Sequence, residues 1–493
     1  MRRFFVKNIL FVVAVNILVK PIWVFFIDRN VQNTVASGAY GTFQALLSLS
    51  IIFQTVLDFG ISSYNSRTIA QNPDKLPDVF PAMLSARLVL MGVYMLLAYG
   101  WGYAFGYRGW ELSLLVGVLL IQSLNALVSF IRSNIAALHK FKTDGIISIT
   151  DRLLMIVICG FLLLYPPTAR RFQIQWFVIA QVVSYFVAAL AGYLVLRRIV
   201  KVKLRFSFNA GEIYVIMRQS FPYALLIFLM SVYNRADAMM IERLCTDGKD
   251  QAGIWAAAFR LLDMANILGL MFATMLLPLF GRMLAQKTDT QPIVKLCVNL
   301  MVPFACMSAV AAVLFGGDIM YTLYHKSPLY AAMGPDYGIV FSILMLSFPA
   351  WCLMYVYSTL LTSNGSLGIL NRIAFAGVIF NLSLNFYLIP HYKAIGGAIT
   401  STLTQTGLAL TFMVFAAKTV KLPFNAQWLL AHLGYILFIA GIGFIVTHLL
   451  RGQHWAVQLG IFSVICVVFM FVFRFVSVGS IRQLAGKKLA AAE

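Results

Sequence analysis

The sequence predicts an all-α polytopic membrane protein, and three observations carry this expectation. Of the 493 residues, 61% are hydrophobic and only 11% are charged, whereas a soluble domain carries about 25% charged residues. The mean hydropathy is +0.85. The apolar runs reach about twenty residues or more, which is the length of a membrane-spanning helix, whereas the strands of a membrane barrel alternate in polarity over about ten residues.

The apolar runs define about fourteen candidate spans, with ends uncertain by several residues. We expect the first run to be a retained span rather than a signal peptide, because Lys20 and Pro21 interrupt it and no small-residue cleavage motif follows. The short gap around Pro390 leaves a count of twelve open. The candidate spans cover residues 8–27, 38–58, 79–103, 112–138, 146–165, 175–196, 217–241, 253–280, 293–316, 337–361, 372–389, 396–417, 428–450 and 455–476.

The distribution of Lys and Arg over the loops predicts that both termini lie in the cytoplasm. With the N-terminus inside, the cytoplasmic loops carry roughly twice as many Lys and Arg residues as the opposite side, as the positive-inside rule requires. The longest loops, 197–216 and 317–336, are too short for a folded extramembrane domain. We therefore expect the protein to function within the membrane.

An internal repeat predicts two lobes, as in many transporters. When the sequence is shifted by 215 residues, Arg67–Gln71 aligns with Arg282–Gln286, and Lys20 aligns with Arg235. Both halves begin on the cytoplasmic side, so the repeats are parallel. We expect a six-helix lobe over 1–200, a second over 201–420, and two additional spans with a short basic tail over 421–493.

Six basic residues lie inside the predicted spans. A Lys or Arg at the centre of a bilayer helix costs about 2.5–3.5 kcal/mol on insertion scales, so each needs an explanation. The structural interpretation is an ion pair or a side chain that reaches the membrane interface. The functional interpretation is a cationic cavity for an anion, because the arginine fork can donate two hydrogen bonds to a phosphate. The six candidates for substrate binding are Lys20, Arg87, Arg132, Arg152, Arg235 and Arg260.

Acidic and aromatic residues inside the spans supply further candidates. Acidic residues are fewer than basic ones among the deep charges, which argues against a cavity for cationic drugs. Some of them are candidates for coupling to Na⁺ or H⁺, and aromatic rings near the cationic helices are candidates for sugar contacts. These residues are Asp58, Asp237 and Asp263 for ion coupling, and Tyr40, Tyr233 and Trp255 for sugar contacts.

Other function classes lack support in the sequence. The cysteines and histidines show no metal-ligand spacing, and no Walker, HExxH, GxSxG or GxGxxG pattern is present. We therefore expect no metal, no cofactor and no enzymatic activity. The net charge of +21 would suggest a nucleic-acid partner in a soluble protein, but the short loops contain no basic domain.

Four groups of residues form a recognisable pattern. They are 39–41 with 57–60; 141–144 with 151–152; 220–224 with 233–237; and Asn381, Asn385, 388–390 and 396–398. They resemble, in this order, the second helix, the junction of helices 4 and 5, the seventh helix, and helices 11 and 12 of bacterial polysaccharide flippases. That family belongs to the multidrug/oligosaccharidyl-lipid/polysaccharide exporter superfamily, and the likeness extends over essentially the whole chain.

The resemblance implies a V-shaped bundle that works by alternating access. It implies a flippase that moves undecaprenyl-pyrophosphate-linked oligosaccharide repeat units from the cytoplasmic to the outer leaflet of the bacterial inner membrane, as in O-antigen and lipopolysaccharide biosynthesis. The bilayer, a polysaccharide polymerase and glycosyltransferases would be its partners. In related flippases, basic residues of helices 1 and 8 line the cavity, and Lys20 and Arg260 occupy comparable helices here.

Two other transport functions stay open. A cation-coupled antiporter of the same superfamily for drugs or small molecules would depend on carboxylates. A flippase for a lipid-linked peptidoglycan precursor would bind a similar anion. A membrane-bound polymerase or ligase usually has a large external loop, which this sequence lacks.

Overall fold

The computed structural model describes residues 19, 22–35, 37–59, 76–138, 140–169, 171–200, 210–420, 426–473 and 475. The regular structure within these residues is helical, and the predicted all-α fold class is confirmed. The described chain forms two compact units. The first contains the residues up to Gly253 together with Lys326–Leu329, and the second contains Ile254–His325 and the residues from Tyr330 onward. The division into lobes at residues 200 and 420 stays a prediction.

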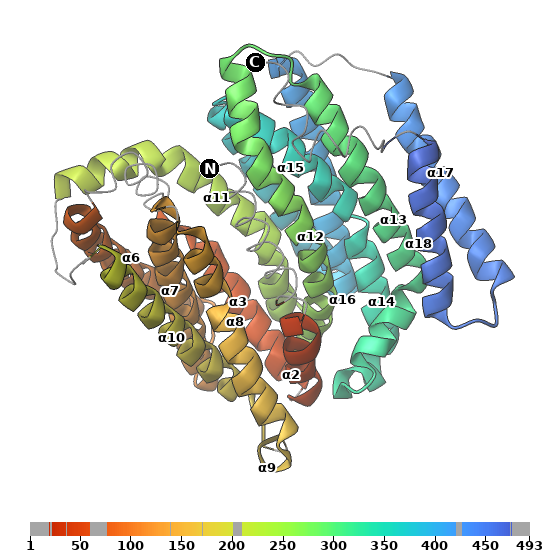
Figure 1. Cartoon of the computed structure of the whole chain (residues 1–493). Coiled ribbons are helices and arrows are strands. Elements are labelled where there is room, and N and C mark those ends of the chain that lie inside the picture. The colour runs from red at the N-terminus through yellow and green to blue at the C-terminus, as the bar shows by residue number, and fades with distance from the viewer. Residues whose placement is uncertain are drawn as a thin grey trace. The chain divides into compact units, whose positions relative to one another are not determined.

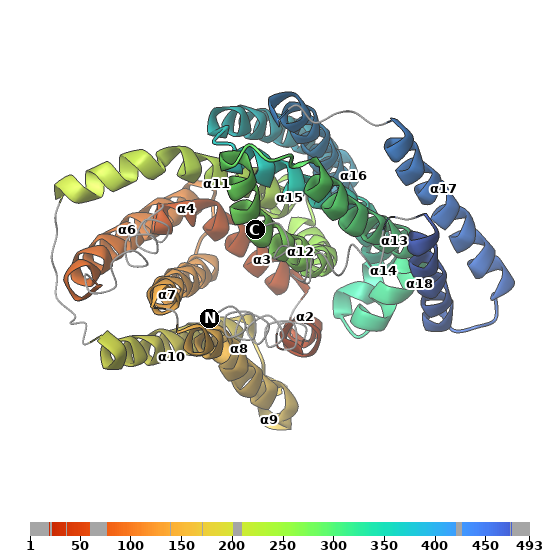
Figure 2. The ribbon, with the colours of Figure 1, turned by 45° about the horizontal axis from the view of Figure 1, so that its top comes forward.

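The first unit is built around α7, which packs against α3, α6, α8 and α10 (Figure 1). Figure 2 shows α7 with α6 on one side and α10 on the other. α11 packs against α3. The elements of this unit are the π-helical turn η1 (Trp23–Asp28), α2 (Arg29–Thr34), α3 (Ser37–Phe53), α4 (Thr55–Asp58), α6 (Leu76–Ala104), α7 (Trp110–Ala137), α8 (Phe141–Leu164), α9 (Pro166–Ala169), α10 (Ile174–Val200), α11 (Ala210–Leu244) and the first turn of α12.

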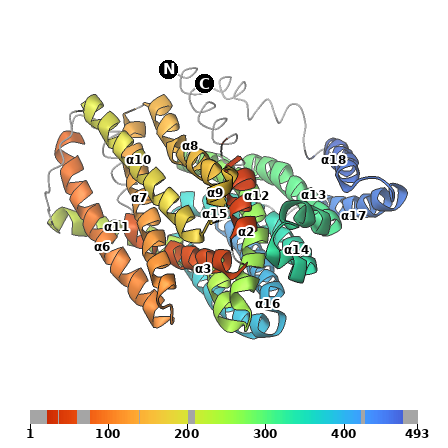
Figure 3. The ribbon, with the colours of Figure 1, turned by 90° about the horizontal axis from the view of Figure 1, so that it is seen from below.

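The second unit is built around α13 and α15. α15 packs against α13 and α16, and α13 also contacts α17 and α18. α17 and α18 lie side by side (Figure 3). These last two helices are the predicted additional spans. The elements of this unit are α12 (Gly248–Ala285), α13 (Gln291–Tyr324), α14 (Pro328–Met345), α15 (Phe348–Ser363), α16 (Leu367–Val420), α17 (Ala426–Leu449) and α18 (Trp455–Val472).

The long helix α16 contains two predicted spans, 372–389 and 396–417. It bends at Lys393, where the backbone adopts φ 53°, a left-handed conformation that is uncommon for residues other than glycine. Gly396 permits the bend, because a Cβ atom there would meet the carbonyl oxygen of Leu388 at 2.3 Å. The gap around Pro390 is therefore a turn between two antiparallel spans rather than a continuous helix.

Ten helices among the described residues are long and apolar enough to cross a membrane. They correspond to predicted spans three to seven, nine to eleven, thirteen and fourteen, and α16 also holds the twelfth. The second predicted span corresponds to the shorter apolar helix Gly38–Phe53, and the eighth corresponds to α12. The first span lies mostly outside the described residues. The chain is a multi-pass membrane protein.

Candidate functional site

Arg152, in the middle of α8, is the centre of a polar cluster within the first unit. Its guanidinium carbon lies 5.5 Å from the ring centroid of Trp23 and 5.8 Å from that of Tyr185, distances at which a ring face stabilises a cation. Its Nε atom lies 3.5 Å from Oδ2 of Asp151, and 28% of its side chain is exposed. Arg152 is thus partly accessible and lies close to two aromatic rings and a carboxylate.

The π-helical turn η1 brings two further groups to this cluster. Trp23 stacks on Phe177 of α10 with a centroid distance of 5.8 Å, which fixes the ring that faces Arg152. Asp28, at the end of η1, accepts a hydrogen bond of 3.0 Å from the hydroxyl of Tyr40 on α3, and its carboxylate is close enough to Arg152 for a charge interaction. π-helical segments are rare and occur frequently at functional sites.

The forked end of Arg152 is the chemically available part of the cluster. Within the residues that the structure describes, the guanidinium donates no hydrogen bond, and its shortest distance to Asp151 is 3.5 Å, from Nε to Oδ2. Tyr185 lies close enough to Asp151 for an electrostatic interaction. The planar guanidinium can therefore donate two parallel hydrogen bonds to two oxygens of a phosphate.

Arg87, a second predicted substrate cation, lies in a closed environment. It is 1% exposed and forms an ion pair with Asp58 of α4. Its Nη1 donates to the carbonyl oxygen of Ala126 at 3.1 Å, and its guanidinium lies 5.0 Å from the ring centroid of Phe130. Asp58, a candidate for ion coupling, is therefore the counter-charge of a buried arginine.

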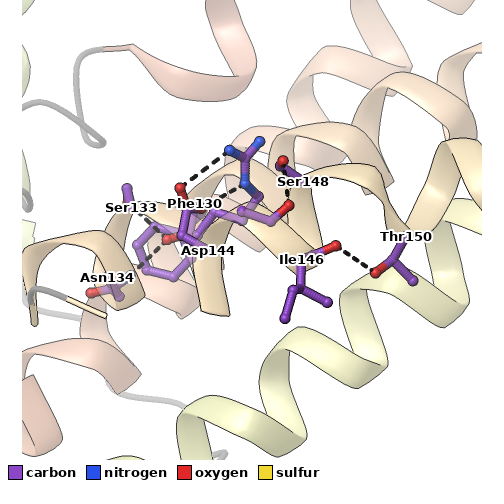
Figure 4. A network of polar contacts seen from close by, with 9 residues as sticks. Phe130, Ser133, Asn134, Asp144, Ile146, Ser148 and Thr150 are labelled. Carbon is purple, nitrogen blue, oxygen red and sulfur yellow. Dashed lines mark hydrogen bonds and ion pairs between the residues drawn. The ribbon is translucent and has the colours of Figure 1, made fainter. Parts of the chain in front are cut away.

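Arg132 of α7 forms a bidentate ion pair with Asp144 of α8. Its Nε donates to Oδ1 of Asp144 at 2.7 Å and its Nη2 donates to Oδ2 at 3.4 Å. Ser133 and Asn134, on the same turn of α7, both donate to the carbonyl oxygen of Phe130 (Figure 4). The geometry ties the start of α8 to α7.

The remaining predicted site residues are distributed over both units. In the first unit, Arg235 is half-buried on α11, and Tyr233 and Asp237 are buried. In the second, Nη1 of Arg260 on α12 donates to the hydroxyl of Tyr324 at 2.8 Å, and Asp263 is half-buried one turn further on.

The predicted sugar-contacting rings of Tyr40, Tyr233 and Trp255 are at most 2% exposed. Tyr40 contributes to the Arg152 cluster through Asp28, and Trp255 stacks on Phe259 at 4.3 Å. Lys20 lies outside the described residues.

Sequence reasoning missed Trp23, Asp28 and Tyr185 as members of the Arg152 cluster. Asp28 adjoins Arg29 near the predicted outer end of the first span, so it reads as a loop residue. The available signal for Tyr185 was a polar stretch with Gln181 and Ser184 inside an apolar helix, and all three residues are buried.

A second polar cluster joins α11 and the start of α12 to the rest of the first unit. The hydroxyl of Tyr107, in the turn after α6, donates to Glu242, and the guanidinium of Arg243 lies 3.6 Å from the ring centroid of Tyr107. Burial and the nearby Glu242 carboxylate raise the pKa of Tyr107 above its usual range, so the hydroxyl stays a donor. Lys249 Nζ donates to Oε1 of Glu111 at 2.6 Å.

Close backbone packing accompanies these bonds. Gln32 Nε2 donates to the carbonyl oxygen of Gly253 at 3.1 Å. A Cβ atom on Gly41 would meet the carbonyl oxygen of Lys249 at 1.8 Å, so only glycine fits at this point of α3. The start of α12 is therefore fixed against α2 and α3.

Comparisons with known proteins agree with this fold. A family model described as "Polysaccharide biosynthesis protein" matches residues 5–284. The structure of the lipid II flippase MurJ in an inward closed conformation is similar, with a TM-score of 0.70, 13% identity, and coverage of 96% of this chain and 98% of that chain. No curated protein sequence matches the chain.

Two transporters of the MOP superfamily are also similar. An inward-facing multidrug resistance MATE family transporter has a TM-score of 0.63 and 15% identity, covering 80% of this chain and 94% of that chain. A transporter from Pyrococcus furiosus has a TM-score of 0.56 and 14% identity, covering 84% of this chain and 94% of that chain. The fold is thus that of the flippases and transporters of the MOP superfamily. Within it, the chain belongs to the polysaccharide biosynthesis protein family, because that family model matches more than half of its length.

Proposed function

We propose that this protein is a flippase that moves undecaprenyl-pyrophosphate-linked oligosaccharide repeat units from the cytoplasmic to the outer leaflet of the bacterial inner membrane. The observation that carries the proposal is Arg152, an arginine inside an apolar helix whose side chain is 28% exposed and whose guanidinium donates no hydrogen bond to the described residues. A diphosphate has the charge and geometry to occupy that fork. The polysaccharide biosynthesis family supports a sugar-bearing substrate.

In this proposal the diphosphate is bound by deep cations and the polyprenyl chain stays in the lipid. Lys20, Arg132, Arg235 and Arg260 remain candidate cations, of which Arg260 is half-buried on α12, whereas Arg87 is neutralised by Asp58. The membrane potential assists export, since moving one charge through 100 mV is worth about 2.3 kcal/mol and the anion leaves a negative interior. The protein needs no cofactor and catalyses no covalent step. Glycosyltransferases supply the substrate and a polymerase consumes it.

The test is transbilayer movement in reconstituted vesicles. Fluorescent undecaprenyl-pyrophosphate oligosaccharide and lipid II are compared as substrates, with Arg152→Gln as the variant and Arg198→Gln as the matched control. Arg198 lies exposed in the last turn of α10. We expect the wild type and the control to move the oligosaccharide lipid, and Arg152→Gln to be slower by about tenfold or more.

Each other outcome contradicts part of the proposal. If lipid II moves and the oligosaccharide lipid does not, the substrate is a peptidoglycan precursor. If neither moves but a cationic drug is exchanged for Na⁺ or H⁺, the protein is an antiporter. Equal rates for Arg152→Gln and the wild type would remove Arg152 from substrate binding.

A further inference from the structure

A continuous row of four tyrosine rings connects Arg260 to the surface of the second unit. Arg260 donates to the hydroxyl of Tyr324 at 2.8 Å. The ring centroids of Tyr324 and Tyr337 are 5.6 Å apart, those of Tyr337 and Tyr330 are 5.2 Å apart, and those of Tyr330 and Tyr321 are 5.9 Å apart. All three distances fall in the range of about 4.5–7 Å for aromatic contacts. We call these four residues the tyrosine row.

The tyrosine row changes from buried to exposed along its length. Tyr324 and Tyr337 are at most 1% exposed, whereas Tyr321 is 58% exposed and Tyr330 is half-buried. Tyrosines at the membrane interface commonly act as single anchors, with the ring in lipid and the hydroxyl in water. Anchoring does not explain a chain of ring contacts that continues inward to a half-buried cation.

The backbone of α14 is shaped around Tyr330. The helix bends at Met333, which adopts φ −134° and ψ 30°. A Cβ atom on Gly334 would meet Cε1 of Tyr330 at 2.8 Å, so the ring lies directly over this glycine. The bend and the glycine together place Tyr330 against Tyr321 and Tyr337, which an interfacial anchor would not require.

Polar groups accompany the exposed end of the tyrosine row. Asp318 is exposed one turn before Tyr321 on α13, and its carboxylate is close enough to Tyr330 for a charge interaction. The exposed His325 ring lies 5.1 Å from the ring of Tyr321. Sugars offer apolar C–H faces that pack on aromatic rings and hydroxyl groups that donate to carboxylates, which accept hydrogen bonds only.

We propose that Tyr321, Tyr330, Asp318 and His325 bind the saccharide portion of the substrate, at the end of α13 that the charge distribution predicts to face outward. This inference rests on the proposed function, because it takes the sugar part of the same lipid-linked molecule as the ligand. Arg260, which contacts the inner end of the tyrosine row, is one of the candidate cations for the attached phosphate.

The test measures binding of the free saccharide to the full-length protein in lipid nanodiscs. The probe is the water-soluble oligosaccharide that mild acid releases from the lipid-linked oligosaccharides of the producing cell, and the readout is saturation-transfer NMR. Tyr321→Ala is compared with Tyr392→Ala, a matched control that is 56% exposed at the bend of α16 and contacts only a histidine ring among the aromatic contacts described. Tyr321→Trp keeps an aromatic face, and Gly334→Ala displaces Tyr330.

We expect the wild type, Tyr392→Ala and Tyr321→Trp to bind the saccharide, and Tyr321→Ala and Gly334→Ala to raise its Kd by about tenfold. No binding by the wild type, or equal loss in Tyr321→Ala and Tyr392→Ala, overturns the inference and identifies Tyr321 as an interfacial anchor. Vesicle transport by the wild type is measured in parallel. Transport without saccharide binding refutes the tyrosine row alone, whereas absence of transport refutes the proposed function.

Discussion

Arg87 and Arg152 are both arginines inside apolar helices of the first unit, yet their surroundings differ. Arg87 is 1% exposed and has a carboxylate, a backbone carbonyl and a ring face around it. Arg152 is 28% exposed, and its shortest distance to the carboxylate of Asp151 is 3.5 Å, too long for a charge-assisted hydrogen bond. A cation inside a membrane helix can therefore be neutralised completely by the protein or only in part. A partly neutralised cation retains donors for a ligand.

The physical cost of each arginine is offset differently. The insertion cost of about 2.5–3.5 kcal/mol is met at Arg87 by an ion pair and a hydrogen bond from within the protein. At Arg152, two aromatic rings each contribute about 0.5–2 kcal/mol, and Asp151 and Asp28 add charge compensation. An anionic ligand would complete the neutralisation at Arg152, whereas Arg87 needs none.

The largest effect is expected from removing the counter-charge of Arg87. Asp58→Ala leaves a buried guanidinium without its carboxylate, which costs about 3 kcal/mol of stability. Arg87→Met leaves only Asp58, whose side chain is 42% exposed, so it destabilises the protein less. The measurement is the thermal unfolding midpoint in detergent.

The double variant Arg87→Met/Asp58→Ala serves as the control for this asymmetry. It removes both charges together, so its unfolding midpoint should recover most of the loss caused by Asp58→Ala alone. An Arg87→Met protein that unfolds at a lower temperature than Asp58→Ala would show that Arg87 stabilises the unit by packing rather than by its charge.

A smaller effect, on transport alone, is expected from Arg152→Lys. Lysine keeps the positive charge but lacks the planar fork, so a diphosphate loses one of two parallel hydrogen bonds. We expect transport of the oligosaccharide lipid to slow by about tenfold, with an unfolding midpoint equal to that of the wild type. Transport at the wild-type rate would mean that a positive charge without the planar fork suffices to bind the diphosphate. A large loss of stability would mean that Arg152, like Arg87, has a structural role.

The sequence predicted the helices well because a run of about twenty apolar residues has few other stable structures in a membrane. It also located Arg87, Arg132 and Arg152 inside their helices. It could not tell which of them were paired, because Asp58 and Arg87 are 29 residues apart and on different helices. Their meeting depends on how α4, α6 and α7 pack.

The Arg152 cluster was harder to predict for a second reason. Trp23 and Asp28 reach it through a π-helical turn, and hydrophobic periodicity is read at 3.6 residues per turn. A π-helical turn shifts the side chains that follow it away from the expected face. The sequence therefore indicated a deep cation on α8 but not the aromatic and acidic groups that surround it.

The smallest effect is expected at Lys249 and Glu111, a pair close to the membrane surface. Lys249 is 47% exposed and Glu111 is 12% exposed. Exposed pairs contribute about 0.2–1 kcal/mol, and Glu111 lies in the first turn of α7, where the helix dipole stabilises a carboxylate without any partner. Lys249→Gln should thus lower the unfolding midpoint only slightly, and less in high salt.

Glu111→Gln is the matched change on the other side of this pair and should cost somewhat more, because it removes the favourable dipole interaction as well. The same order is expected for Asp58 and Arg87, because in both pairs removing the carboxylate costs more than removing the cation. At Asp58 the added cost comes from the buried guanidinium that loses its counter-charge, and at Glu111 it comes from the lost interaction with the helix dipole. If Lys249→Gln is instead as harmful as Asp58→Ala, the contact between α7 and the start of α12 contributes as much stability as the buried pair at Arg87. The degree of burial would then not explain how much each ion pair of this unit contributes to stability.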